Sequence, residues 1–69
     1  MNKDLEMYTQ DHCIFCLKAK EVIKNNPDMG FQLTEYNMSK HPAHKDTLKE
    51  RFPGAKTAPQ IWIGGKHIG

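Results

Sequence analysis

The feature that most constrains this chain is a pair of cysteines, Cys13 and Cys16, at the junction between a strand-like and a helix-like segment. They are the only two cysteines of the chain. At the start of a helix, such a pair can close a small disulfide, reopen it and attack the disulfide of a substrate. The spacing therefore predicts thiol–disulfide chemistry, and its rivals are a zinc site and two buried, inert cysteines.

A zinc site fits the histidine pattern poorly. Zinc takes four ligands, and a zinc finger would supply two histidines with about three to five residues between them, roughly 12 to 15 residues after the second cysteine. His41 and His44 are closer together than that and lie beyond this window. We therefore expect no metal, and we interpret His41, His44 and His67 as surface residues.

Size and charge exclude other classes of function. A chain of 69 residues makes one small domain, and folding removes only about 60% of its unfolded surface from water, so the core should be thin. Ten lysines and arginines against eight acidic residues leave a net charge of +2. The basic residues form no run and Arg51 is the single arginine, which argues against a nucleic-acid partner.

No stretch of the sequence predicts a signal peptide or a membrane span. The first six residues contain no long apolar run, and nothing downstream approaches the ~20 apolar residues that a bilayer requires. We therefore expect a cytoplasmic protein that binds no membrane. Cytoplasmic thiols are kept reduced, so a cysteine pair there is more often catalytic than a permanent disulfide.

Apolar patterning predicts the first elements of the fold. Leu5, Glu6 and Met7 alternate in polarity within residues 3–8, and residues 31–36 continue this kind of pattern with β-favouring side chains, which predicts two strands. Apolar residues at near-helical spacing predict a helix at 13–24 and, with Ser39 as its cap, a second helix at 41–52. Because strand–helix–strand units nearly always have a right-handed crossover, the two strands should be parallel.

The end of the chain predicts a hairpin. Residues 60–63 and 66–68 favour strands, and Gly64-Gly65 suits a two-residue turn between them. In this hairpin Trp62 should lie opposite His67, and its alternation with apolar neighbours predicts burial against a helix. The order β-α-β-α-β-β predicts an α/β fold with a mixed four-stranded sheet.

Two segments carry a resemblance to a known family. One is Tyr-Thr-Gln-Asp-His-Cys-Ile-Phe-Cys, from Tyr8 to Cys16, and the other begins with Thr-Ala-Pro at Thr57 and runs through the Gly-Gly hairpin. Two cysteines alone are a weak signal, but together with the Thr-x-Pro segment these residues resemble a glutaredoxin. The resemblance covers nearly the whole chain. It implies a thioredoxin-like fold, glutathione-dependent dithiol activity and a cis peptide bond before Pro59.

The resemblance also implies a set of site residues. Cys13 is expected to attack the substrate disulfide, because unpaired N–H groups at a helix N-terminus favour a thiolate, and Cys16 is expected to resolve the mixed disulfide. Lys56 matches a basic position that in many glutaredoxins meets the glycine carboxylate of glutathione. The glutathione-binding residues implied are Gln10, Phe15, Lys56, Thr57, Ala58 and Pro59.

The sequence departs from the family pattern near the thiols. Members usually have Pro-Tyr between the cysteines, where this chain has Ile14-Phe15, and the usual Thr-Val-Pro has Ala58 in its middle. Gln10 stands where many members carry a lysine that contacts the glycine carboxylate. His12 could stabilise the neighbouring thiolate in place of that lysine, or could be an exposed loop residue without a role.

The largest departure is at the end of the chain. Glutaredoxins continue past the position of Gly69 with a second glycine, an acidic pair and a helix whose start binds the γ-glutamyl carboxylate. We therefore expect residues 1–69 to form one glutaredoxin domain that lacks the usual C-terminal helix and exposes apolar surface, which favours association. The chain is then a C-terminally truncated fragment, a natural minimal form or an oligomer, and we expect a monomer or a weak dimer.

The function implied is reduction of protein disulfides or glutathione mixed disulfides, with glutathione as the electron donor. The expected partners are glutathione and disulfide-containing proteins, and ribonucleotide reductase is a common client of the family. Two alternatives stay open. One is a glutaredoxin-like thioredoxin reduced by a flavoprotein reductase, and the other is a binder of an iron–sulfur cluster held by Cys13 and glutathione between two chains.

Overall fold

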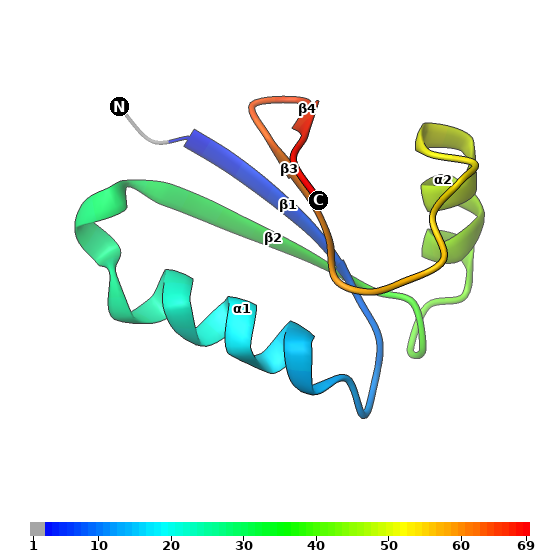
Figure 1. The fold of residues 1–69 in the computed structure, drawn as a ribbon, viewed down its shortest axis with the longest axis horizontal. Helices are drawn as coiled ribbons and strands as arrows, with labels where there is room; N and C mark the ends of the chain where they lie inside the picture. The colour runs from blue at the N-terminus through cyan, green and yellow to red at the C-terminus, as the bar shows by residue number, and fades with distance from the viewer. Residues whose placement is uncertain (1–2) are drawn as a thin grey trace.

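The computed structural model describes residues 3–69. Its strands form one mixed four-stranded sheet (Figure 1). Its strand order is β2-β1-β3-β4. The central strand β1 (Lys3–Thr9) pairs in parallel with β2 (Phe31–Asn37) and antiparallel with β3 (Gln60–Ile63), which pairs antiparallel with β4 (Lys66–His67). The predicted α/β fold, its parallel first unit and its terminal hairpin are confirmed.

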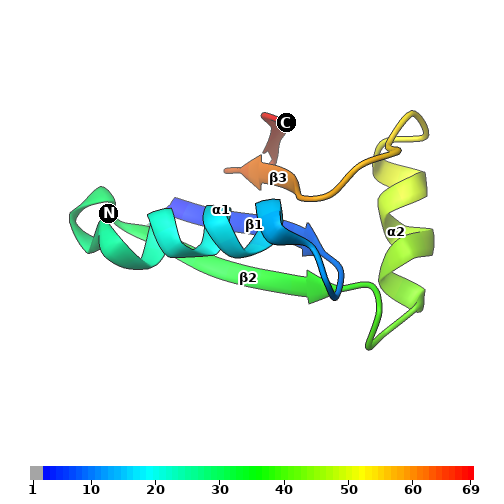
Figure 2. The ribbon, with the colours of Figure 1, turned by 60° about the horizontal axis from the view of Figure 1, so that its bottom comes forward.

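Two α-helices and a short 3₁₀ turn accompany the sheet within the described residues. Helix α1 (Ile14–Asn25) lies along one face, over β1 and β2, and η1 (Pro27–Met29) leads from it into β2 (Figures 1 and 2). Helix α2 (Ala43–Arg51) stands across the end of the sheet where β1 and β2 finish (Figure 2). Neither helix is long and apolar enough to cross a membrane.

The two faces of the sheet bury different side chains. On β1, Leu5 and Met7 are buried on the α1 side, where Cys16 is the one buried residue of the helix. The alternate residue Tyr8 points to the opposite face and packs with Leu48 of α2 and with Trp62, which is 5% exposed. Trp62 is therefore buried against a helix as predicted, and the core is as thin as the chain length implies.

The alternation expected for strand β2 breaks at its end. Leu33 pairs with Leu5 on the α1 face, and Glu35, two residues further on, shares that face. Tyr36 consequently turns to the opposite face, where its ring lies 4.8 Å from that of Tyr8. The polarity alternation therefore ends at Thr34, and Glu35 places an exposed carboxylate on the α1 face of the strand.

The start of α2 also differs from the prediction. Ser39 does not cap the helix; its hydroxyl instead accepts a hydrogen bond from the Asp11 backbone N–H at 2.9 Å. The turn before the helix is held by Asn37, whose Oδ1 accepts from the N–H groups of Ser39 and Lys40, both at 2.9 Å. Ser39 lies too early in the chain to cap α2, because the helix begins at Ala43 and its N-cap residue is Pro42.

The terminal hairpin has the predicted register. Trp62 pairs with His67, and Gly64 and Gly65 both adopt positive φ angles of 57° and 83°, which only glycine adopts at little cost in such a turn. His67 is not the surface residue that we expected. Its ring is half-buried 4.5 Å from the Trp62 ring and shares a 2.8 Å hydrogen bond with Gln60, because the hairpin register places it there.

Several large apolar side chains stay on the surface. Ile14, Phe15, Leu17 and Val22 on α1 are 56–66% exposed, and Ile68 after β4 is likewise exposed. Phe15, between the two thiols, is thus accessible to solvent. The expectation that a missing C-terminal helix leaves one face of the sheet uncovered stays a prediction.

Candidate active site

Cys13 is the N-cap residue of α1, so the helix begins at Ile14, one residue after the predicted start. Its Sγ accepts a hydrogen bond from the Cys16 backbone N–H at 3.3 Å, so the sulfur itself satisfies one of the unpaired donors of the first turn. On its other side the Cys13 thiol donates to the Ala58 carbonyl at 3.6 Å. A thiolate at this position would be stabilised by the helix N-terminus.

Cys16 lies one turn further along α1 in a different environment. Its side chain is 1% exposed, and burial raises the pKa of its thiol to about 11, with the hydrogen bond to Cys13 adding to the rise. Both cysteines are free thiols. Residues three apart lie on the same face of a helix, as the short loop of such a disulfide requires. The pair can therefore alternate between dithiol and disulfide, with the accessible sulfur on Cys13.

The segment before Pro59 is anchored by the terminal hairpin. The Ala58–Pro59 peptide bond is cis, as the resemblance implied. Buried Gln60 donates from Nε2 to the Thr57 carbonyl at 2.9 Å and contacts the Thr57 hydroxyl at 3.2 Å. Since His67 in turn hydrogen-bonds to Gln60, the hairpin positions the backbone that faces Cys13.

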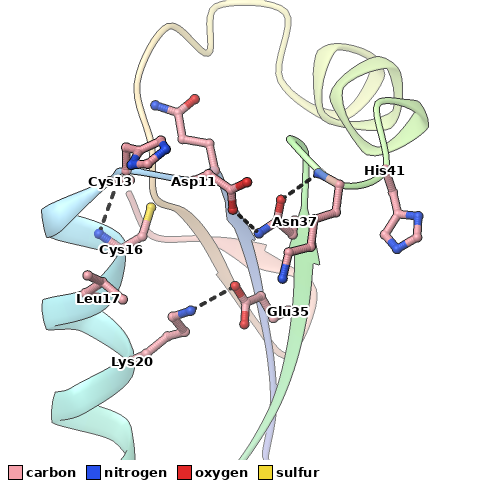
Figure 3. Close-up of a pocket in the computed structure, with 11 residues that line it drawn as sticks. Asp11, Cys13, Cys16, Leu17, Lys20, Glu35, Asn37 and His41 are labelled. Carbon is pink, nitrogen blue, oxygen red and sulfur yellow. Dashed lines mark hydrogen bonds and ion pairs between the residues drawn. The ribbon is translucent and has the colours of Figure 1, made fainter.

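A cavity of about 390 Å³ opens beside the two thiols, between α1 and the end of β2 (Figure 3). Its walls carry Cys13, Cys16 and four charged side chains, Asp11, Lys20, Glu35 and Lys40. The Asp11 carboxylate accepts a hydrogen bond from the Asn37 amide at 3.1 Å, which ties the loop before α1 to β2. The cavity is therefore polar on the side away from the helix.

A second cavity of similar size lies between α2 and the segment before Ala58. It brings together three of the residues that the resemblance implied, Gln10, Lys56 and Thr57. Lys45 and Lys49 of α2 line it as well, which the sequence analysis missed. Their spacing of four residues on one helix face was the available signal.

The remaining predicted residues lie outside the second cavity. Phe15 projects from the first turn of α1 into solvent and lines neither cavity. His12 is exposed, lines the first cavity and adopts a left-handed backbone with φ of 58°. Within residues 3–69 no three side chains of His, Cys, Asp or Glu come together as a metal site would require. Both roles considered for His12 stay predictions.

Comparison with known proteins agrees with this arrangement. The sequence profile of the glutaredoxin family matches residues 5–68. The chain belongs to the glutaredoxin family. Glutaredoxins are thiol–disulfide oxidoreductases, so the activity of this class is that expected of two free thiols at a helix N-terminus.

Individual relatives extend over most of this glutaredoxin. It is 33% identical over 63 residues to a glutaredoxin of Pseudomonas aeruginosa, covering 91% of this chain and 70% of the relative. It is 30% identical over 66 residues to glutaredoxin 3 of Escherichia coli, covering 96% of this chain and 75% of that protein. The crystal structure of glutaredoxin 1 from Francisella tularensis complexed with cacodylate superposes with a TM-score of 0.74 at 25% identity, over 97% of this chain and 81% of that one.

The two thiols of this glutaredoxin should differ sharply toward alkylation. At pH 7, iodoacetamide is expected to modify Cys13 and to leave Cys16 unmodified, because Cys16 is buried and its raised pKa of about 11 keeps it protonated. Tandem mass spectrometry of the labelled peptide measures the two positions. In guanidinium both thiols should react, and equal modification of both in the folded protein would contradict the assignment.

Proposed function

We propose that this glutaredoxin reduces glutathione mixed disulfides and protein disulfides by a dithiol mechanism, with glutathione as the electron donor. The observation that carries the proposal is the position of the Cys13 sulfur, at the N-cap of α1 and 3.6 Å from the Ala58 carbonyl. A disulfide that lies along the Ala58 backbone would present one sulfur to Cys13.

The first step is attack by the Cys13 thiolate. The thiolate forms a bond to one sulfur of the substrate disulfide, and the electron pair of the broken S–S bond leaves with the other sulfur. The N–H groups of the first turn of α1 stabilise the attacking anion before the reaction, so no dipole has to reorganise. The product is a mixed disulfide on Cys13.

The second step releases Cys13. When the mixed disulfide is with glutathione, a second glutathione can attack and regenerate the thiol. When it is with a protein, Cys16 attacks Cys13, a disulfide closes between them, and glutathione then reduces it. Cys16 is suited to the second role because it is buried, one turn from Cys13 and shielded from competing disulfides.

The second cavity is the proposed subsite for glutathione. Glutathione carries two carboxylates, and Lys56, Lys45 and Lys49 supply positive charge around the cavity. Gln10 and Thr57 line the cavity and can offer hydrogen bonds. We assign the backbone of the next residues, Ala58 and Pro59, to the same subsite. We assign Phe15 to the body of a larger substrate, because it is exposed beside Cys13.

A coupled assay tests the electron donor. Reduction of a glutathionylated peptide is followed through NADPH consumption, once with glutathione and glutathione reductase and once with a thioredoxin-type reductase alone. The proposal expects turnover only in the first mixture. Turnover only in the second would make the chain a glutaredoxin-like thioredoxin, an outcome to which Gln10 in place of the family's lysine points.

The wider setting follows from this chemistry. Glutathione keeps thiols reduced in the cytoplasm, which is the compartment that we propose. We further propose that residues 1–69 act as one glutaredoxin domain, as a monomer or weak dimer, on disulfide-containing proteins such as ribonucleotide reductase. Release of reduced thiols from such a client is measured directly by alkylation.

Substitution of Lys56 tests the glutathione subsite. Lys56→Ala should raise the KM for glutathione about two- to fivefold with little change in kcat, because one exposed ion pair contributes up to about 1 kcal/mol. Steady-state kinetics with varied glutathione measure both constants. Lys66→Ala is the matched control, since Lys66 is exposed on β4 and lines neither cavity. An unchanged KM in Lys56→Ala would remove Lys56 from the subsite.

A further inference from the structure

An ion pair that the proposed mechanism does not use lies in the cavity beside the thiols. Lys20 is one turn after Cys16 on α1, and both side chains project from the helix toward β2 (Figure 3). The Lys20 Nζ lies 3.0 Å from the Glu35 Oε2, and the side chains of the pair are 32% and 30% exposed. Both residues line the same cavity as Cys16.

Strand β1 of the sheet also contacts this ion pair. The buried hydroxyl of Thr9 donates to the same Glu35 oxygen at 2.6 Å. Glu35 lies on the α1 face of β2, two residues after Leu33, and stays exposed. A carboxylate held in this way limits where the Lys20 ammonium can go, and it keeps that charge on the helix face that carries Cys16.

The buried Cys16 thiol must ionise before it can act as a nucleophile. To attack the mixed disulfide it must become a thiolate, and burial raises the pKa of its thiol to about 11. The nearby positive charge of Lys20 acts in the opposite direction and favours the thiolate.

We propose that Lys20, held by Glu35, is a positioning residue for the resolving step, whose ammonium promotes ionisation of Cys16. The inference rests on the dithiol mechanism proposed above. It concerns the second half of the reaction alone, because the Cys13 thiolate is stabilised by the N–H groups of the helix N-terminus, one of which already donates to its sulfur.

The step balances without a further reactant. The Cys16 thiol releases its proton to water in the cavity, and its sulfur attacks the Cys13 sulfur. A bond forms between the two cysteine sulfurs, and the bond from Cys13 to the substrate sulfur breaks. The departing sulfur keeps the electron pair and takes up a proton, so Cys16 is oxidised and the substrate thiol is the reduced product.

Other titratable groups line the same cavity and are present both in the parent protein and in the variants described below. They come from the loop after β1, from the N-cap of α1 and from the connection between β2 and α2, and are Asp11, His12, Cys13, Lys40 and His41. A change in pH profile that follows one substitution therefore reports the charge that was removed.

A single-turnover reaction with dithiodipyridine separates the two thiols. Attack by Cys13 releases a first thiopyridone at a rate that depends on reagent concentration, and attack by Cys16 releases a second at a rate that does not. Cys16→Ser should lack the second phase, which assigns it. Neither phase requires glutathione, so the result does not depend on whether glutathione is the electron donor.

Loss of the Lys20 charge and loss of the Glu35 charge should shift the pH profile of the second phase in opposite directions. Lys20→Met should slow it about threefold at pH 7 and shift its pH profile upward, because a tenfold loss of thiolate is partly offset by higher nucleophilicity. Glu35→Gln keeps hydrogen-bonding oxygen for Thr9 and Lys20 but removes the opposing charge, so the profile should shift downward. The first phase should stay within about twofold in both variants.

Lys24→Met is the matched control, because Lys24 is an exposed lysine of α1 that does not line the cavity. It should leave both phases unchanged. The inference is overturned if Lys20→Met leaves the second phase unchanged or slows both phases equally. It is also overturned if Lys20→Met and Glu35→Gln shift the profile in the same direction, because that pattern would come from loosened packing rather than from charge.

Discussion

Replacement of Cys13 by serine is expected to reduce disulfide-reducing activity by at least about 1,000-fold, because a serine hydroxyl does not ionise near neutral pH and cannot act as the nucleophile in thiol–disulfide exchange. Serine is a good N-cap residue and can accept the hydrogen bond from the Cys16 N–H that the sulfur now accepts at 3.3 Å. The fold should therefore survive, and the loss should report chemistry alone. Coupled turnover of a glutathionylated peptide measures it.

Cys16→Ser is the control that separates the two thiols. With Cys13 intact, this variant should still release glutathione from a mixed disulfide, because a second glutathione can replace the resolving thiol. Reduction of a protein disulfide should fall by at least about tenfold, since that reaction depends on Cys16. If Cys13→Ser retained activity while Cys16→Ser lost it, the assignment of attacking and resolving thiols would be reversed.

The largest effect on stability is expected at Arg51, the last residue of α2. Its Nη1 and Nη2 each lie 3.1 Å from a Glu6 oxygen, Nη1 also lies 3.1 Å from the Tyr8 hydroxyl, and the guanidinium is 4.2 Å from the Trp62 ring centre. The side chains of Arg51 and Glu6 are 27% and 26% exposed, which lies between a surface and a buried pair. These contacts join α2 to the sheet.

Arg51→Ala should lower the free energy of unfolding by about 2 kcal/mol, because it leaves Glu6 with only the Tyr36 hydroxyl as partner and removes packing from Trp62. For a domain of this size that loss corresponds to a decrease in Tm of about 8–16 °C. Thermal unfolding followed by circular dichroism measures it. Glu50→Ala on the exposed side of the same helix should change Tm by no more than a few degrees.

The effect of Arg51→Ala should depend on pH. The hydrogen bond from Arg51, partly opposed by desolvation, lowers the pKa of the Glu6 carboxyl below 4.5 in the folded protein. A lowered carboxyl pKa contributes stability that is present above the unfolded value and is lost as pH falls through the folded value. The difference in unfolding free energy between the parent and Arg51→Ala should therefore narrow below about pH 4.5. A difference that stays constant down to pH 2 would exclude the ion pair as its source.

Much of this fold could be predicted because its signals are local. The cysteine pair at the start of α1, the strands with apolar residues and the Gly64-Gly65 turn each depend on residues within a few positions of one another. Periodicity and turn chemistry act over that range, so they identify elements and their order. The family resemblance then supplied the cis bond before Pro59, which no local pattern predicts.

The surroundings of the thiols depend instead on contacts between distant parts of the chain. Thr9 and Glu35 are 26 residues apart, and Cys13 and Ala58 are 45 apart. The strand pattern around Glu35 could not show that this exposed carboxylate meets a hydroxyl of β1 and an ammonium of α1, because those partners are distant in the sequence.

The sequence by itself therefore determined the thioredoxin-like element order and the position of the two thiols at a helix start. Only the tertiary structure decided which charges surround those thiols: Lys20 and Glu35 beside Cys16, and Lys45 and Lys49 beside Lys56. The physical reason is that side-chain charges act through space over several ångströms, whereas sequence patterns record only the neighbours along the chain.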